Sequence, residues 1–202
     1  DVLSDEQLST ITSLSCSGFD KSDEEKVVNV EGIENLINLR GLYLGGNIIE
    51  TINLNSLSQL VTLVIDQNQL QELDLSNNNN LDLLSAKYNQ LSNIKISYNN
   101  RLRDVSIDHN QLTKFEGYNL PELDRIHISN NKLTTLTFNN PNKLREIVAN
   151  NNLLTNADFT NVPHLKSLTL SQNQLTSVNL TSISNLVSLY LNDNLLTSLN
   201  LT

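Results

Sequence analysis

The chain has 202 residues and a net charge of −9, and no apolar run approaches the roughly 18 residues that a membrane helix needs. Nine acids and two bases fall in residues 1–38, so residues 39–202 are nearly neutral. Nucleic acid is an unsuitable partner, because a duplex-binding surface needs a basic stripe and this chain has none. Membrane insertion is excluded as well.

Residues 1–38 read as the remnant of an N-terminal cap followed by a degenerate first repeat. Ser4 and Gln7 have capping-box spacing, which predicts a short helical turn. Residues 11–16 are expected to form a first strand that places Cys16 inward as a buried thiol. Residues 18–29 are charged and predict an insertion loop. Since Cys16 is the only cysteine, no internal disulfide can form, which fits a bacterial or cytosolic protein.

From Leu39 onward, the pattern LxxLxLxxNxL returns every 21 residues, eight times, without insertion or deletion. A fixed period of this kind is the signature of a leucine-rich repeat solenoid of the α/β type. We expect a right-handed arc over residues 39–202, with a parallel β-sheet on its concave side. No polar cap follows the eighth repeat, and the chain begins at Asp1 without Met, so we expect a trimmed piece of a longer protein.

Position 9 of every repeat is asparagine. At this position the chain turns away from the strand and leaves backbone groups without strand partners, which a stacked row of side-chain amides can satisfy. The sequence therefore predicts a structural ladder of Asn47, Asn68, Asn89, Asn110, Asn131, Asn152, Asn173 and Asn194.

The second half of each repeat alternates apolar and polar residues with a period of two, at positions 14 and 16. Leu73 with Leu75 and Val178 with Leu180 are examples. This alternation, in segments rich in Asn, Ser and Thr, predicts a convex side that is mostly extended or 3₁₀-helical rather than α-helical.

The stretch Asp1–Leu14, followed by Val30–Leu39, resembles the junction between cap and repeats in the internalin family of Gram-positive bacteria. The 21-residue period and the segment Asn-Gln-Leu-Thr-Ser-Val at 173–178 are similar to bacterial repeats of this kind. The resemblance implies a secreted or surface-attached protein, with a role in adhesion or virulence, that binds another protein through its concave face. A fuller helical cap and a following immunoglobulin-like domain, both common in that family, are absent from this sequence.

Positions 2, 3, 5, 7 and 8 of each repeat are expected to be exposed on the concave face. An apolar patch over repeats one to three would contain Tyr43, Val61, Val64, Leu83 and Tyr88. Tyrosine favours binding hot spots, although aromatic and β-branched residues also simply suit strands. In repeats four to six, positions 2 and 3 alternate in charge, which fits either cross-strand pairing or a charged recognition patch. Both readings can hold together.

Ser106, His127, Asp104 and Asp108 imitate a catalytic set, but an open sheet offers no oxyanion hole or water-excluding pocket. His109 and His127 are too far apart along their strands to converge on one zinc ion. We therefore expect no enzyme activity, no metal and no cofactor.

The favoured interpretation is a monomeric, non-enzymatic recognition module of a bacterial surface or secreted protein. Its partner would be a protein, with a host cell-surface receptor as one candidate. A structural or cell-wall-associated spacer and a glycan-binding adhesin are the alternatives. The residues predicted to bind the partner are Tyr43, Val64, Tyr88, Arg103, Arg125, His127, Arg145 and Tyr190.

Overall fold

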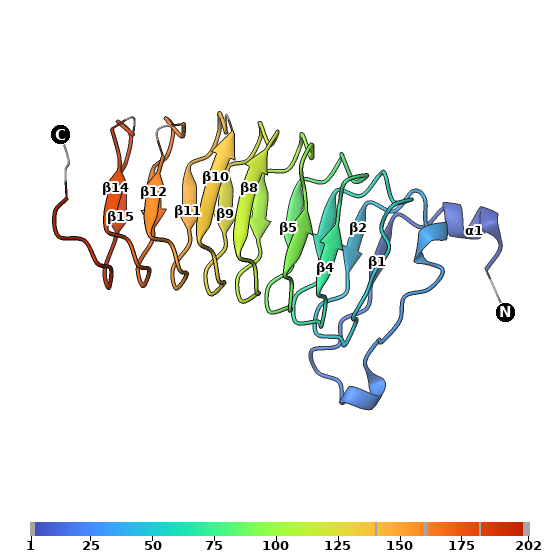
Figure 1. Ribbon diagram of the computed structural model, residues 1–202. Coiled ribbons are helices and arrows are strands. Elements are labelled where there is room, and N and C mark those ends of the chain that lie inside the picture. The colour runs from blue at the N-terminus through green and yellow to red at the C-terminus, as the bar shows by residue number, and fades with distance from the viewer. Residues whose placement is uncertain (1–2, 140, 160, 182, 200–202) are drawn as a thin grey trace.

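The computed structural model describes residues 3–139, 141–159, 161–181 and 183–199. The chain winds into a solenoid in which one strand of each turn joins a continuous parallel sheet (Figure 1). The predicted ends of the cap segment and of the eighth repeat, residues 1–2 and 200–202, lie outside the described residues. The nine strands of the sheet, in spatial order, are β1 (Ser13–Ser15), β2 (Gly41–Tyr43), β3 (Thr62–Val64), β5 (Leu83–Ser85), β7 (Asp104–Ser106), β9 (Arg125–His127), β11 (Glu146–Val148), β13 (Ser167–Thr169) and β15 (Ser188–Tyr190).

Strand register follows the sequence period. Cα partners in the sheet are 21 residues apart, as in Gly41 with Thr62, and this offset holds through β15. The offset between β1 and β2 is 28 residues, from Ser13 to Gly41. The first turn is therefore seven residues longer than the others, and the predicted insertion loop, residues 18–29, projects from the solenoid (Figure 1).

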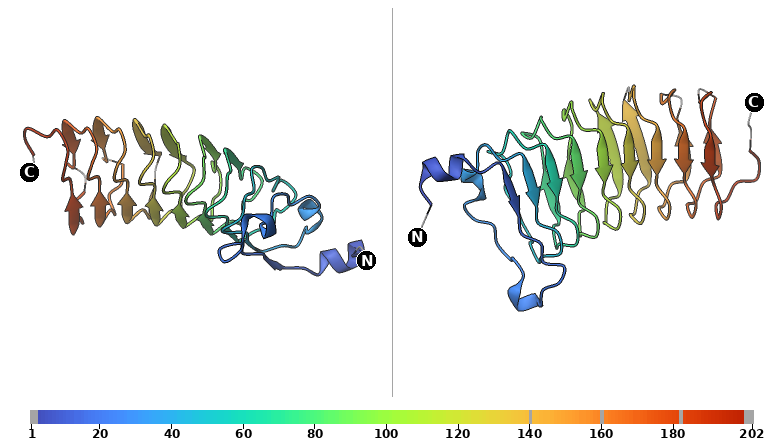
Figure 2. Two further views of the ribbon diagram at one scale, coloured as in Figure 1. Left: turned by 90° about the horizontal axis from the view of Figure 1, so that it is seen from below. Right: turned by 180° about the vertical axis from the view of Figure 1, so that it is seen from behind.

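The return segments form a second layer behind the sheet (Figure 2). Six short strands pair there in three parallel two-stranded sheets. The pairs are β4 (Glu72–Asp74) with β6 (Asn93–Lys95), β8 (Lys114–Tyr118) with β10 (Thr135–Asn139), and β12 (Asn156–Asp158) with β14 (Ser177–Asn179). The predicted fold class is confirmed, and in the described repeats the return side is extended rather than 3₁₀.

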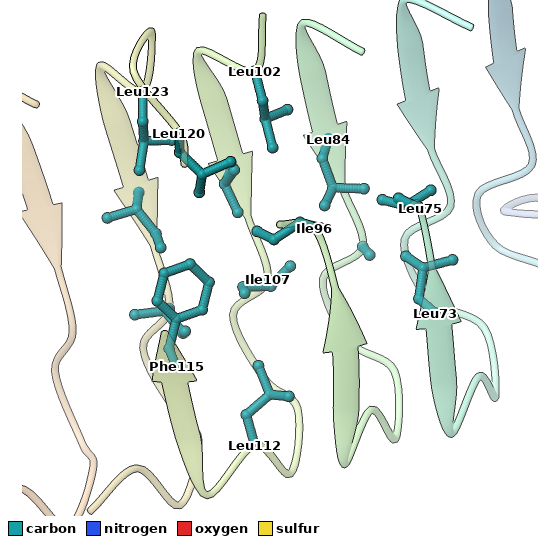
Figure 3. Close-up of a cluster of buried hydrophobic side chains, with 14 of the residues drawn as sticks. Leu73, Leu75, Leu84, Ile96, Leu102, Ile107, Leu112, Phe115, Leu120 and Leu123 are labelled. Atoms are coloured by element: carbon teal, nitrogen blue, oxygen red, sulfur yellow. The ribbon is translucent and has the colours of Figure 1, made fainter. Parts of the chain in front are cut away.

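The core fills the space between the two layers (Figure 3). Leu84 and Ile107 enter it from the sheet side, and Ile96 and Phe115 enter it from the return side. Each of these side chains is at most 3% exposed. Fully burying a side chain of this size contributes roughly 1.5–3 kcal/mol, so a core running the length of the solenoid supports every turn.

The asparagines at position 9 bridge neighbouring turns. The Asn110 amide nitrogen donates to the carbonyl oxygens of Ala86 and Ile107, at 2.9 and 3.1 Å, and its side-chain oxygen accepts from the Leu91 backbone N–H. The same pattern of donors and acceptor runs from Asn47 to Asn194. These amides therefore form a ladder that closes each turn onto the preceding one.

The N-terminal segment contains three short helices. Helix α1 (Asp5–Ser9) begins at the predicted capping box, in which Ser4 and Gln7 bond reciprocally. The two 3₁₀ turns are η1 (Asp23–Glu25) and η2 (Ile33–Asn35). None of the helices in the described part of the chain is long and apolar enough to cross a bilayer.

Cys16 corrects one sequence-based expectation. Residues 13–15 do form the predicted first strand, but the Cys16 side chain is half-buried rather than buried. The physical reason is its place on the first turn, where no preceding turn covers the apolar residues around Leu14 and Val27 in the described part of the chain.

Candidate functional site

The outward side of the nine-stranded sheet carries the side chains at positions 2, 3 and 5 of each repeat, and we call it the sheet face. Strands β3, β7, β11 and β13 each bury their middle residue and leave the two flanking residues partly exposed. This alternation follows from the two-residue period of a strand. Since the strands are hydrogen-bonded throughout, the sheet face presents these side chains in fixed register.

An aromatic and aliphatic pair occupies the N-terminal end of the sheet face. Tyr43 and Val64 are Cα partners on β2 and β3, and the Tyr43 side chain is 38% exposed. A Cβ atom on Gly41 would lie only 3.0 Å from Cε2 of Tyr43. The glycine therefore gives the tyrosine ring room to lie against the strand while the ring keeps an open surface.

At the other end of the sheet, Tyr190 on β15 is 54% exposed, and Val187 beside it is 82% exposed. Tyr190 is a Cα partner of Thr169. The two predicted position-5 tyrosines thus lie at opposite ends of the sheet face and do not form one patch.

Tyr88 lies off the strand, in the turn at position 8, where its φ of 54° is left-handed. Its ring stacks on that of His109, with centroids 4.1 Å apart and planes 11° from parallel. His109 Nε2 lies 3.2 Å from the Asn130 amide nitrogen. Tyr88 therefore contributes to a row of exposed turn side chains beside the sheet face, with His109 as its ring partner.

Predicted charges in the middle of the sheet face pair with one another. Arg103 makes two hydrogen bonds to Asp82, and Arg125 makes two to Asp104, at 2.5 and 3.1 Å. Arg145 lies 3.7 Å from Asp124. The Arg103 hydrogen bond lowers the pKa of the Asp82 carboxyl. Cross-strand pairing is thus present, while the Arg103 and Arg125 side chains remain 59% and 55% exposed.

The residues that imitate a catalytic set have other partners. Asp104 is bound by Arg125, and a carboxylate oxygen of Asp108 accepts the Ser129 backbone N–H at 2.8 Å. His127 Nε2 lies 3.7 Å from Glu146, although its Cα partner is Ser106. No cluster of three metal-ligating side chains occurs among the described residues. The geometry therefore provides no directed chain from carboxylate to histidine to serine.

Position 7 corrects another expectation, since its side chains were expected to be exposed, and most of them are half-buried or buried. Several accept a backbone N–H from position 7 of the next turn. Asp66 accepts from Lys87, Ser129 accepts from Asn150, and Asn150 accepts from Ser171. Short acceptors recur at this position because they satisfy the sheet where it ends, and that column of Asp, Ser and Asn was the signal in the sequence.

A second set of buried side-chain amides, at position 19, was not predicted from the sequence. Asn78 and Asn99 are 0% exposed on the return side, and each amide nitrogen donates to two main-chain carbonyls of the preceding turn. They occupy position 19, where repeats one, four, six and seven carry an apolar residue. An asparagine standing in an otherwise apolar column is the signal that could have identified them.

Comparison with solved structures places the fold among leucine-rich repeat proteins. The functional domain of InlJ from Listeria monocytogenes superposes with a TM-score of 0.87 at 27% identity, over 97% of this chain and 42% of that one. The leucine-rich repeat domain of APL1B gives 0.81 at 23% identity, over 98% and 58%. YopM, an effector of Yersinia pestis, gives 0.62 at 27% identity, over 81% and 52%. No family model and no curated protein sequence matches.

These likenesses, together with the 21-residue register, make the chain a leucine-rich repeat solenoid, the architecture of a protein-interaction module. Within that class its neighbours include the internalins, and the predicted internalin-like character is confirmed. The chain spans less than two thirds of the length of these structural neighbours, 42% of the InlJ domain and 58% of the APL1B domain.

Proposed function

We propose that the chain recognises a protein partner on the sheet face, without catalysis, as part of a bacterial surface or secreted protein. The observation that carries the proposal is a rigid nine-stranded sheet with exposed aromatic anchors at its two ends and exposed arginines between them. A large host cell-surface receptor is the partner class that could span such a length, and the chain would meet it as a monomer.

Energetically, the tyrosines and the arginines would contribute in different ways. Tyr43 and Tyr190 can bury a large ring at low entropic cost, which is the usual behaviour of hot-spot residues. Arg103 and Arg125 are already held by carboxylates of the preceding turn, so little side-chain entropy is lost when a partner approaches them. The charged middle would thus set orientation, and the ends would supply most of the affinity. Val64, Tyr88, His127 and Arg145 complete the proposed surface.

The proposal is tested by binding the labelled chain to intact mammalian epithelial cells, with a Tyr43→Ala/Arg125→Ala/Tyr190→Ala variant alongside. The return side offers a matched control, because Tyr98 and Tyr118 are 63% and 42% exposed there. We expect saturable binding that weakens at least about tenfold in the sheet-face variant, since each hot-spot truncation costs on the order of 1–2 kcal/mol. A Tyr98→Ala/Tyr118→Ala variant should bind like the parent.

Equal binding by the parent and the sheet-face variant would overturn the proposal, as would selective loss in the return-side variant. A parent that binds no cells would favour the alternative, a structural or cell-wall-associated spacer. Thermal unfolding of each variant is measured first, so that a loss of binding is attributed to the surface and not to misfolding.

A further inference from the structure

A pocket of unusual charge lies where the chain enters strands β11 and β13. It is lined by Asn142, Lys143, Arg145, His164, Lys166 and Asn185. All six side chains are polar, four are basic and none is acidic. In a chain of net charge −9, such a concentration of bases indicates a site for an anion.

The repeat explains how these bases come together. Residues at positions 21 and 2 flank the buried leucine at position 1, so both point outward on the same side of the chain. Lys143 and Arg145 flank Leu144, and His164 and Lys166 flank Leu165. Parallel stacking, with β11 paired to β13, sets the second pair of bases beside the first.

Neighbouring acids neutralise only half of this group. One turn earlier, the same two positions hold Glu122 and Asp124, which lie 2.5 Å from Lys143 and 3.7 Å from Arg145. Glu146 on β11 lies toward His127, at 3.7 Å. Lys166 and His164 have no carboxylate within ion-pair distance in the described part of the chain. Positive charge therefore remains at the β13 side of the pocket.

The donor set favours an oxyanion on a saccharide. Lysine, arginine and side-chain amides donate hydrogen bonds to sulfate and carboxylate oxygens, and a histidine N–H donates in either protonation state. No apolar side chain lines the pocket, so it offers nothing to anchor the apolar residues of a peptide. Because exposed charges act weakly one by one, a ligand carrying several sulfates on one chain fits better than a free ion.

We propose that this pocket binds a sulfated saccharide. The pocket shares Arg145 with the proposed protein-binding surface but does not include Tyr43 or Tyr190. A sulfated glycan bound here could hold the chain at a glycan-coated surface while the two tyrosine ends of the sheet face remain open.

The test titrates the full chain with a heparin-derived hexasaccharide, its chemically desulfated counterpart, inorganic sulfate and a hexaglutamate peptide, by calorimetry at low salt. We expect the sulfated hexasaccharide to bind most tightly. Its affinity should fall at least about tenfold on desulfation and about as much between 0.05 and 0.3 M NaCl, because exposed charges are screened. Lys166→Glu should weaken binding strongly.

Lys132→Glu is the matched control. Lys132 is an exposed lysine in the segment after strand β9, whereas the pocket lies where the chain enters the strands. It is bonded to the Gln111 side chain, so the same charge change is made at a separate site. This variant should bind like the parent. An equal loss of affinity in both variants would mean that binding depends on net charge alone, and the proposed site would then be wrong. The ligand assignment would be wrong if the parent did not detectably bind the sulfated hexasaccharide. It would also be wrong if the desulfated hexasaccharide, hexaglutamate or inorganic sulfate bound equally tightly.

Discussion

Two kinds of buried asparagine look alike in the sequence but differ in what depends on them. At position 9, the Leu91 backbone N–H has the side-chain oxygen of Asn110 as its acceptor. At position 19, the Asn78 amide donates to the carbonyls of Leu54 and Leu57, which already accept the backbone N–H groups of Leu57 and Leu60. Loss of the first amide therefore leaves a buried donor unpaired, whereas loss of the second does not.

Replacement by leucine should separate the two roles. Asn110→Leu is expected to lower the free energy of unfolding by roughly 1–3 kcal/mol, the usual cost of a buried group left unpaired. Asn78→Leu should cost less than about 1 kcal/mol, since its own side-chain oxygen is already buried without a partner. Urea denaturation measures both, with exposed Asn100→Leu as control. Equal costs at positions 78 and 110 would contradict this assignment.

At the scale of elements, the insertion loop is held against the first repeat by two glycines. A Cβ on Gly46 would lie 2.5 Å from the Phe19 backbone nitrogen, and one on Gly45 would lie 2.8 Å from the Phe19 ring. The left-handed φ of Gly46 does not itself require glycine, because Gln67, Tyr88 and His109 adopt similar angles at the same position. The close approach of Phe19 requires it.

Gly46→Ala should therefore release the insertion loop. We expect trypsin to cut after Lys21 and Lys26 several-fold faster in this variant than in the parent, since the added methyl group displaces the backbone at Phe19. Gln67→Ala, at the same position of the next turn, is the control and should leave cleavage unchanged. Unaltered cleavage in Gly46→Ala would mean that other contacts hold the loop.

Cross-strand ion pairs join elements on the return side as well. Lys95 on β6 lies 2.8 Å from Asp74 on β4. This contact, with hydrogen bonds from the Ser76 hydroxyl and backbone N–H, lowers the pKa of Asp74 from 3.8 to about 2. A lowered carboxyl pKa contributes stability above the unfolded value, and that contribution is lost as the pH falls toward 2.

Asp74→Asn should accordingly be less stable than the parent at neutral pH and should lose less stability on acidification. The measurement is the thermal midpoint from about pH 5 down to about pH 2, the window in which the paired carboxyl takes up its proton. Asp20→Asn, in the exposed insertion loop, is the reference. Parallel curves for the parent and Asp74→Asn would show that the pair contributes nothing to folding.

For the molecule as a whole, most of the fold could be predicted from the 21-residue period of the sequence. A repeat of 21 residues leaves room for one strand, one turn and an extended return, so it predicts the parallel sheet and the absence of α-helix among the described residues from Leu39 to Leu199. The alternating charges of repeats four to six predicted cross-strand pairing as one of two readings. The stacked turns show that Arg103 and Arg125 are each bound by the carboxylate 21 residues before them.

Other features depend on how the turns stack and on which turn a residue occupies. Tyr88 and His109 lie one period apart at position 8, and the left-handed turn there brings their rings into a stack. The half-exposure of Cys16 follows from its place on the first turn, not from its strand position. The basic pocket is formed by variable residues at positions 21 and 2, on either side of the leucine at position 1. Their proximity becomes visible once the turns are stacked.

Recognition on the sheet face can be tested by masking that face, without relying on any one predicted contact residue. In a Cys16→Ser background, a single cysteine is placed at Ser106, in the middle of the sheet face, or at Asn93, on the return side. Each is coupled to a polyethylene glycol chain before cell binding is measured. We expect the polyethylene glycol at position 106 to abolish binding and the polyethylene glycol at position 93 to leave binding intact. Intact binding with the sheet face masked would contradict this expectation.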